Sequence, residues 1–216
     1  IWNSVAISSS IHTDADTHIE VVTYGQKGDF MNFLFTLLTG KGSRWTRIFM
    51  LLGNIVRRPV TFLKSLWPVG WSRRTLFLLV MQSLDNAIAF RPKKRLFGDG
   101  VRLTTEQDSD KPNPTYIDAG NKAAEWIANW TGGYGQSMLL EAVANIPTTA
   151  HILGGAVVGA DPEHGVIDSE HRVFGYQNML ICDGSAVPAN PGVNPSLTIC
   201  AMSERAMSKI PAKERH

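Results

Sequence analysis

The stretch between positions 151 and 200 contains residue types that hold ligands in folded proteins. Short apolar runs in it alternate with glycine, proline, asparagine, aspartate and histidine. Glycine lets the backbone approach a bound molecule closely, because it carries no side chain. Asp183 and Gly184 directly follow the apolar run 179–182, which predicts a buried strand. Since open α/β sheets bind ligands at the carboxyl ends of their strands, the sequence predicts a binding site at this pair.

A second binding element is predicted a few residues later. Asn194 and Pro195 precede the run 196–207, which predicts a helix that ends near Lys209. The first N–H groups of a helix have no partner within it, and its N-terminus carries a partial positive charge. This end of the helix therefore suits a ligand that bears negative charge.

Alternating and β-branched residues predict the strands that accompany these elements. The first 25 residues predict two strands, 1–11 and 18–24, joined by the polar turn 13–16. Further strands are predicted at 76–81, 87–90 and 101–104, followed by a loop at 108–114. The run 98–103 begins like a dinucleotide-binding fingerprint, but Leu103 stands where the third glycine belongs. We therefore interpret this run as a hairpin turn.

Helices are predicted on both sides of the later strands. Residues 30–74 look helical, and Pro59 and Pro68 mark the start and the end of a short second helix there. An apolar stripe recurs in the first helix at three- and four-residue steps, at Trp45, Ile48, Phe49, Leu52 and Val56. Another helix is predicted over 118–130. Its stripe consists of Ala123, Ala124, Ile127 and Trp130.

Composition excludes several classes of protein. The chain has 216 residues, of which 44% are apolar and 19% charged, as in an ordinary globular protein. A net charge of +2 argues against nucleic acid as the main partner. Cys182 and Cys200 form neither a disulfide framework nor a metal spacing, so no metal site is expected. No apolar run reaches the roughly 18 residues of a membrane span.

Four motifs, which occur in order with short gaps, carry a resemblance to a known family. They are H-x-L-G-G at 151–155, G-V-x-D-x-x-x-R-V-x-G at 165–175, N-x-x-x-x-D-G-S-x-x-P at 178–188 and G-V-N-P-S-L-T at 192–198. Together they resemble the C-terminal signature of the glucose-methanol-choline (GMC) oxidoreductases, in the cholesterol-oxidase-like branch. The resemblance is specific over 148–207 and extends more loosely to 8–12 and 81–86.

The resemblance implies a fold and a division of the chain. The fold is an FAD-binding α/β domain plus a substrate domain, built on an antiparallel sheet with helices over it. Residues 1–147 would form the substrate-binding domain, with a helical lid at about 30–74. Residues 148–216 would form the C-terminal portion of the FAD-binding domain.

The resemblance also implies a partner for this sequence. In this family the dinucleotide fingerprint lies in an N-terminal half, and no such fingerprint occurs here. The sequence begins at Ile1, inside an apolar run, so we expect it to be part of a longer protein and to be inactive alone. A targeting segment cannot then be judged, and cytoplasmic and peripheral-membrane locations both stay open.

The resemblance assigns the candidate site residue by residue. His151 matches the family's active-site histidine, and Asn194 matches its partner at the flavin. The implied cofactor contacts are Asp183, Gly184, Asn194, Pro195, Ser196, Gly154 and Gly155. Oxidation of an alcohol moves a hydride to the flavin and a proton to a base, for which histidine is suited near neutral pH. Some relatives use a pocket glutamate as the base, but no Glu occurs between Glu20 and Glu106.

Three hypotheses for the function stay open. The first is FAD-dependent oxidation of a sterol-like or other bulky apolar alcohol, which the apolar content of residues 30–90 favours. The second is the same chemistry on a small polar alcohol. The third is a non-catalytic remnant or a module that binds lipid surfaces. The sequence identifies neither the alcohol nor the acceptor that reoxidises the flavin.

Charge is distributed unevenly along the chain. No Asp or Glu lies between Asp29 and Asp85, whereas eight Lys and Arg residues do. Basic residues beside Trp, Phe and Leu are typical of helices in a bilayer interface. One interpretation is that residues 30–84 form a membrane-facing lid over the substrate pocket. The alternative is an ordinary helical cap, whose basic face is solvated or meets the N-terminal half.

Overall fold

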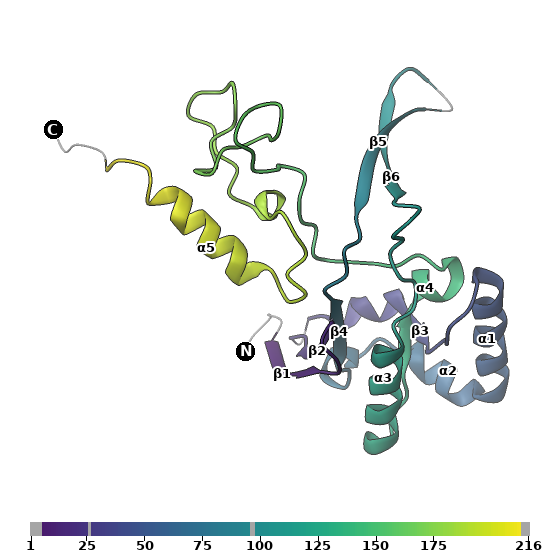
Figure 1. The fold of residues 1–216 in the computed structure, drawn as a ribbon. Coiled ribbons are helices and arrows are strands. Elements are labelled where there is room, and N and C mark those ends of the chain that lie inside the picture. Colours follow the sequence, from purple (N-terminus) through teal and green to yellow (C-terminus); the bar gives the residue numbers. More distant parts are fainter. Residues whose placement is uncertain (1–5, 26, 96–97, 213–216) are drawn as a thin grey trace. The chain divides into compact units, whose positions relative to one another are not determined.

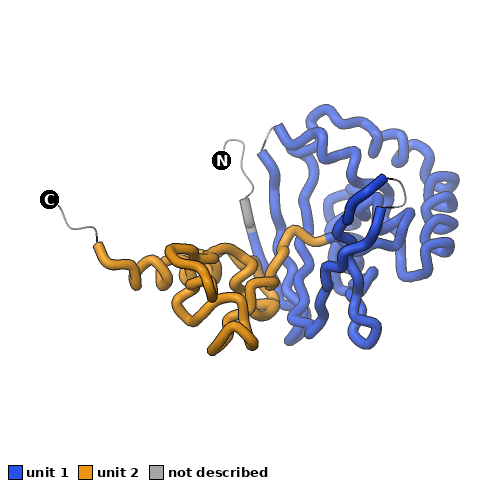
Figure 2. The backbone as a smooth tube through the Cα atoms, turned by 90° about the horizontal axis from the view of Figure 1, so that it is seen from above, with its two compact units in different colours: residues 1–148 blue, residues 149–216 orange. Residues whose placement is uncertain are grey.

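The structure divides into two compact units, which are described separately. A computed structural model describes residues 6–25, 27–95 and 98–212. Residues 1–148 form unit 1 and residues 149–216 form unit 2 (Figure 2). The assignment of substrate binding to one part of the chain and of FAD binding to the other stays a prediction.

Unit 1 contains a three-stranded antiparallel sheet in the order β1 (Ala6–His12), β2 (Thr17–Thr23), β4 (Phe77–Gln82) (Figure 1). The turn between β1 and β2 is held by Asp14, whose carboxylate accepts the N–H of Asp16 at 2.9 Å. The first two predicted strands and their turn are thus confirmed, although positions 1–5 lie outside the described residues. The strand predicted at 76–81 is confirmed as β4.

Aromatic rings pack against one end of this sheet. Phe77 of β4 and Trp71 are both buried, and their rings meet edge to face with centroids 5.2 Å apart. Trp71 begins the short 3-10 helix η2 (Trp71–Arg73), which Asp29 anchors by accepting the hydroxyl of Ser72 at 2.7 Å and its N–H at 2.9 Å. The Ser72 hydroxyl, followed by the backbone N–H groups of Ser72 and Gly70, lowers the pKa of Asp29 below its ordinary value. The carboxylate is therefore a fixed part of the fold.

Two helices follow each other closely in unit 1, α1 (Arg44–Arg57) and α2 (Pro59–Ser65). Ser43 caps α1, because its hydroxyl accepts the N–H of Thr46 at 3.3 Å. Pro59 occupies the first turn of α2, as predicted, where its missing N–H has no cost. Among the described residues, no helix is both long and apolar enough to cross a membrane.

The prediction of helix throughout 30–74 is wrong at its beginning. A 3-10 helix, η1 (Asp29–Leu34), leads into the strand β3 (Phe35–Leu37), which pairs with β7 (Gln136–Met138). The helix α4 (Leu139–Ala144) follows directly and packs Ala142 against Leu37. Because the partner strand lies about a hundred residues away, local sequence cannot reveal this pairing.

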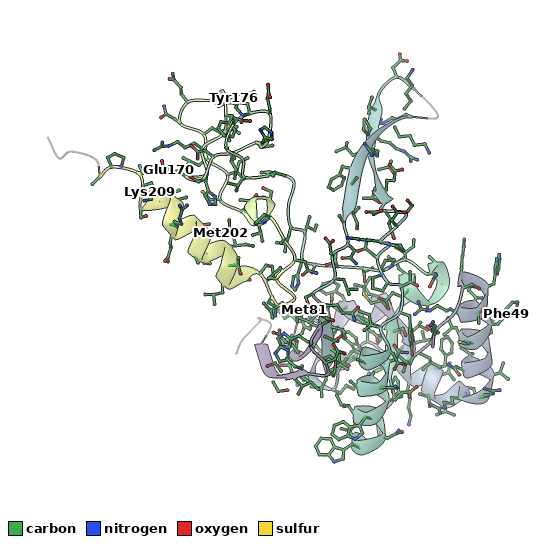
Figure 3. The ribbon with its side chains drawn as sticks, viewed as in Figure 1. Phe49, Met81, Glu170, Tyr176, Met202 and Lys209 are labelled. Carbon is green, nitrogen blue, oxygen red and sulfur yellow. The ribbon has the colours of Figure 1, made fainter. Side chains whose placement is uncertain are left out.

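The apolar stripe predicted for α1 exists, but it faces outward. Trp45, Phe49 and Val56 are 65%, 68% and 79% exposed, and Figure 3 shows Phe49 pointing away from the unit. The opposite side of α1 packs Leu51 into the core and buries Arg47, which is only 2% exposed. The burial of the polar side chain of Arg47 thus determines which side of α1 faces the core.

The buried side chain of Arg47 makes three hydrogen bonds in unit 1. Its guanidinium donates to the carbonyl of Thr115 at 2.8 Å, to Asn145 Oδ1 at 3.1 Å and to Thr39 Oγ1 at 3.3 Å. These acceptors come from three separate stretches of the chain. Arg47 therefore connects α1 to the segments that contain Thr39, Thr115 and Asn145 through hydrogen bonds.

A hairpin of β5 (Ile88–Lys94) and β6 (Val101–Gln107) extends from unit 1 (Figure 1). Phe90 pairs with Thr105 across the two strands, and an ion pair joins Arg91 Nε to Glu106 Oε2 at 2.9 Å. This confirms that the glycine-bearing run at 98–103 belongs to a hairpin, of which positions 96–97 lie outside the described residues.

The helix predicted over 118–130 is confirmed as α3 (Asp118–Thr131). It ends at Gly132, whose φ of 66° is the left-handed conformation that terminates many helices. The predicted stripe is wrong at Trp130, which is 77% exposed and stacks on Trp126 with centroids 5.9 Å apart. The packed side of α3 is instead at Gly120, where an added Cβ would lie 2.8 Å from Val80 Cγ2 of β4.

Unit 2 consists mainly of loops around a small apolar core. Its described elements are the 3-10 helix η3 (Gly184–Ala186) and the predicted helix, α5 (Ser196–Met207). The core is formed by Ala156, Ile167, Val173 and Ala186. Met202 of α5 packs against it, on the side of the helix that faces the loops (Figure 3).

The strand predicted at 179–182 is wrong. In this run only Leu180 pairs, through an isolated antiparallel bridge to Arg172, and Met179 is 47% exposed. Asn178 before the run has a left-handed φ of 58°, and Asp183 after it caps η3. Between the turn at Asn178 and the cap at Asp183, too few residues remain to form a ladder of strand hydrogen bonds.

Candidate active site

Gly184 lies where three parts of unit 2 meet. A Cβ added to it would lie 3.0 Å from the carbonyl oxygen of Ile152 and 3.4 Å from Cδ1 of Ile199 in α5. Backbone bonds fix the same junction, because Gly154 N–H donates to Gly184 O at 3.1 Å and Ala156 N–H to Ser185 O at 2.9 Å. The structure thus brings together the loop after His151, the Asp183–Gly184 pair and the first turns of α5.

Asp183 presents a carboxylate at this junction. It is exposed, and one of its oxygens accepts the backbone N–H of Ser185 at 2.9 Å and also the hydroxyl of Ser185. The hydroxyl bond, followed by the backbone bond, lowers the pKa of Asp183 below its ordinary value. An ionised acceptor for ligand hydroxyl groups is therefore fixed beside Gly184.

His151 is half-buried, at the start of the loop that Gly184 contacts. Its backbone N–H donates to Thr149 Oγ1 at 3.1 Å. Within the described part of the chain, its imidazole makes no hydrogen bond or ion pair. No structural interaction with the described residues thus competes with proton exchange between the ring and a substrate.

The N-terminus of α5 supplies backbone donors. The first helical bond runs from Ile199 N–H to the carbonyl of Pro195 at 2.9 Å, and Pro195, which is buried, offers no side-chain cap. The N–H groups of Ser196 and its two successors thus precede the helical ladder. The helix is held in place by Ser203, whose hydroxyl donates to Cys182 O. Asn194 is half-buried directly before it.

The two glycines after His151 shape an open edge. Gly154 and Gly155 have φ angles of 79° and 110°, which residues with a side chain rarely adopt. A Cβ added to Gly155 would meet nothing within 4 Å. The backbone is therefore accessible here to a flat ligand.

Other histidines in the described residues have structural surroundings. His171 is 3% exposed, and its Nδ1 lies 2.8 Å from the carbonyl oxygen of Ile181. His18 of β2 stacks on His12 with centroids 4.5 Å apart, and its Nε2 lies 3.6 Å from Oε1 of Glu20. No sequence signal predicts the buried pair of His18 and Glu20, because strand alternation alone does not distinguish a buried pair from an exposed one.

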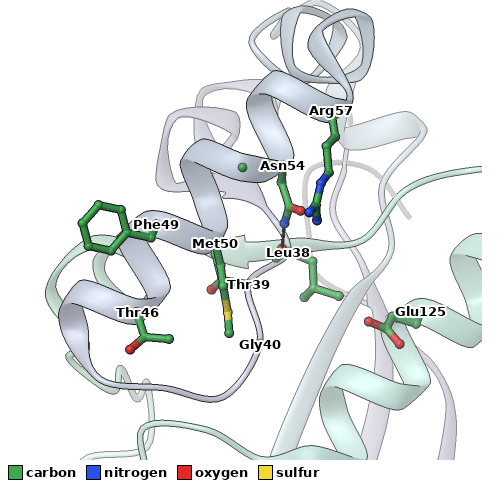
Figure 4. Close-up of a pocket in the computed structure, with 10 residues that line it drawn as sticks. Leu38, Thr39, Gly40, Thr46, Phe49, Met50, Asn54, Arg57 and Glu125 are labelled. Atoms are coloured by element: carbon green, nitrogen blue, oxygen red, sulfur yellow. Dashed lines mark hydrogen bonds between the residues drawn. The ribbon is translucent and has the colours of Figure 1, made fainter.

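A groove of about 570 Å³ lies beside α1 in unit 1 (Figure 4). Phe49 and Arg57 of α1 and Glu125 of α3 line it, and Asn54 donates to the carbonyl of Leu38 at 2.9 Å on its floor. None of the predicted site residues lines this groove. Sequence reasoning missed it, because its lining combines ordinary residues that are distant in the chain.

No group of three or more His, Cys, Asp or Glu side chains that could hold a metal ion occurs within residues 6–25, 27–95 and 98–212. The candidate site in unit 2 instead combines a half-buried imidazole, a carboxylate, glycine backbone and a helix N-terminus. These groups suit an anionic organic cofactor with hydroxyl groups, and an oxidisable substrate beside it.

A comparison with protein families identifies part of the chain. Residues 100–203 match the family model described as GMC oxidoreductase. The matched region includes the junction at Gly184 and the residues from His151 to Asn194. The chain belongs to the GMC oxidoreductase family.

Within the curated proteins, the chain is similar to cholesterol oxidases along nearly its whole length. It is 47% identical over 218 residues to a cholesterol oxidase of Mycobacterium tuberculosis, which covers 99% of this chain. It is 42% identical over 209 residues, 97% of this chain, to a cholesterol oxidase of Acinetobacter baumannii. The chain spans about 37% of the length of each of these relatives.

The junction at Gly184 leads to a testable expectation. Gly184→Ala places a methyl group 3.0 Å from the Ile152 carbonyl, which must move, and we expect a loss of about 1–3 kcal/mol in unfolding free energy. If FAD binds here, as the family resemblance implies, the FAD content should fall as well. The control is Gly53→Ala in α1, where a Cβ meets nothing within 4 Å. Equal urea midpoints and FAD contents for the two variants would show that the close approach is unimportant.

Proposed function

We propose that the protein is an FAD-dependent oxidoreductase that oxidises the CH–OH group of an alcohol, with a sterol-like or other bulky apolar alcohol as substrate. The observation that carries the proposal is the meeting of the His151 loop, Asp183–Gly184 and the start of α5 at one point of unit 2. Membership of the GMC family supports it.

The residues at this junction fit FAD. The exposed carboxylate of Asp183 is suited to accept hydrogen bonds from the ribityl chain, as the family resemblance implies. The first N–H groups of α5, at Ser196 and its two successors, precede the helical ladder and suit the electron-rich edge of the isoalloxazine ring. Gly154 and Gly155 leave the backbone open for close contact. When bound, FAD would accept the hydride from the substrate carbon.

The chain's own residues would position the alcohol and remove its proton. His151 would accept the hydroxyl proton at its imidazole, which no described residue engages. Asn194 would hold the hydroxyl through its amide, which cannot take the proton. We propose that the ADP half of FAD is bound by residues of a longer protein, because the sequence contains no dinucleotide fingerprint.

The proposed substrate class is supported by the relatives, which are cholesterol oxidases. Anaerobic mixing of the full-length, FAD-bound protein with cholesterol in detergent should bleach the flavin absorbance. Bleaching by choline or glucose, with none by cholesterol, would assign the protein to polar alcohols. No bleaching by any alcohol would contradict the proposed activity.

Asn194→Ala tests the second site residue in the same assay. We expect bleaching to slow by roughly 10–10²-fold, because one preorganised hydrogen bond to the reacting oxygen is lost. FAD content should stay unchanged, since the backbone donors of α5 remain. Asn190→Ala, a substitution in the preceding loop, serves as the control. An unchanged bleaching rate in Asn194→Ala would remove this side chain from the mechanism.

A further inference from the structure

The side of α5 that faces the loops of unit 2 carries a polar residue among apolar ones. Residues on this side recur at three- and four-residue steps, and they are Ile199, Met202, Ser203 and Ala206. Ala206 is buried, and Met202 packs against the core of the unit. Ser203 is half-buried between them, at a position where periodicity alone predicts an apolar side chain. The serine therefore indicates a specific contact.

The hydroxyl of Ser203 makes that contact with a second segment of the chain. It lies 2.8 Å from the carbonyl oxygen of Ile199 and also within hydrogen-bond distance of the carbonyl oxygen of Cys182. The bond to Ile199 stays within α5 and is common for a serine in a helix. The bond to Cys182 instead joins α5 to the residue that directly precedes Asp183 and Gly184. Ser203 thus connects the two elements that carry the proposed FAD contacts.

The remaining contacts between these two elements are apolar. The side chain of Ile199 lies against the backbone of Gly184, where an added Cβ would be 3.4 Å from its Cδ1. Apolar contacts have no preferred direction, so they tolerate small shifts of a helix along its axis. A hydroxyl bond requires a separation of about 2.7 Å and a suitable angle. The Ser203 bond therefore fixes the position of α5 relative to Asp183.

We infer that Ser203 is a positioning residue, which aligns the N-terminus of α5 with Asp183 so that both reach the same FAD. This inference rests on FAD binding as proposed above, but not on the identity of the alcohol. The isoalloxazine ring and the ribityl chain are covalently joined, so the groups that contact them must be held at a fixed separation. The partial positive charge at the start of α5 stabilises negative charge on the reduced ring only if the helix points at it. Ser203 would therefore affect the reduction potential of bound FAD.

The test measures this reduction potential in the full-length, FAD-bound protein by equilibration with reference dyes. In Ser203→Ala we expect the reduced flavin to be stabilised roughly two- to five-fold less, the usual contribution of a helix terminus. The potential should then be more negative by about 10–20 mV. The matched control is Ser208→Ala, because Ser208 is exposed and its hydroxyl bonds to the carbonyl of Arg205 at 2.8 Å, near the same helix end. This control should keep the potential of the unsubstituted protein.

A second pair of variants separates the hydrogen bond from the volume of the side chain. Ser203→Thr and Ser203→Val introduce side chains of nearly the same shape, but only threonine keeps a hydroxyl donor. We expect Ser203→Thr to retain the potential and Ser203→Val to shift it as Ser203→Ala does. Urea unfolding of the same variants shows whether a shift in potential accompanies or precedes a loss of stability.

Two results would overturn the inference. One is an equal potential in Ser203→Ala and Ser208→Ala, even if Ser203→Ala unfolds at lower urea, because the bond would then stabilise unit 2 without aligning the site. The other is an equal potential in Ser203→Thr and Ser203→Val. The proposed alcohol oxidation fails by a separate result, the absence of bleaching by any alcohol, since dithionite and the dyes set the redox state without an alcohol.

Discussion

His151→Ala is expected to slow the bleaching of bound FAD by alcohol roughly 10²–10⁴-fold, the usual effect of a positioned acid–base group. The imidazole takes part in no hydrogen bond with the described residues, so its removal should leave the fold and the FAD content unchanged. Stopped-flow absorbance measures the rate, and the flavin-to-protein ratio measures retention. Added imidazole should restore part of the lost rate.

The control for this substitution is His164→Ala in the same unit. His164 is exposed and lies 2.7 Å from Asp161, which makes it a surface residue of matched type. We expect the flavin of this variant to bleach at the same rate as in the unsubstituted protein. If the flavin of His151→Ala bleaches as fast as that of His164→Ala, His151 is not the base.

Arg47→Ala is expected to lower the unfolding free energy by about 3 kcal/mol or more, because three acceptors lose a charged donor in a buried setting. Urea unfolding followed by tryptophan fluorescence measures the change. Arg57→Ala on the same helix is exposed and should cost at most about 0.5 kcal/mol. Arg47→Lys should fall between them, since an ammonium cannot reproduce the fork of guanidinium donors.

If Arg47→Ala and Arg57→Ala unfold at the same urea concentration, the buried guanidinium does not stabilise unit 1. The side of α1 that faces the core would then be determined by the burial of Leu51 alone. Circular dichroism of the folded variants checks that both retain their helices before the comparison is made.

The sequence predicted the elements whose turns, caps and strand alternation depend on residues that are close together in the chain. Alternation and the polar turn predicted β1 and β2, because Asp14 closes the turn with its own side chain. The proline at position 59 predicted the start of α2, and the glycine-bearing run predicted the β5–β6 hairpin. In each case, the residues that give the signal also make the stabilising contact.

Prediction failed where distant residues decide the outcome. The apolar stripe of α1 was visible in the sequence, but its direction depends on Arg47, whose acceptors lie on other segments. Periodicity favours burying a stripe of Trp and Phe, and it cannot weigh a buried guanidinium against them. The run 179–182 looks like a strand, yet it has no partner long enough to form a ladder.

The candidate site could be predicted from its motifs but not from physical signals alone. The structure places Gly184 close to Ile152 and to Ile199 of α5, whereas the cofactor contacts that the motifs imply stay a prediction. The roles of His151 and Asn194 stay predictions that follow from the family. Composition and spacing would not have separated His151 from His171, which is the more buried of the two.

The small core of unit 2 has a consequence for the fate of the protein in a cell. Among its described residues, six apolar side chains are buried, three of them alanines, and they contribute little hydrophobic free energy to hold so many loops. A cofactor that binds only the folded form adds stability in proportion to the logarithm of its concentration. If FAD binds as we propose, the resistance of the folded protein to proteolysis should therefore rise with the concentration of FAD.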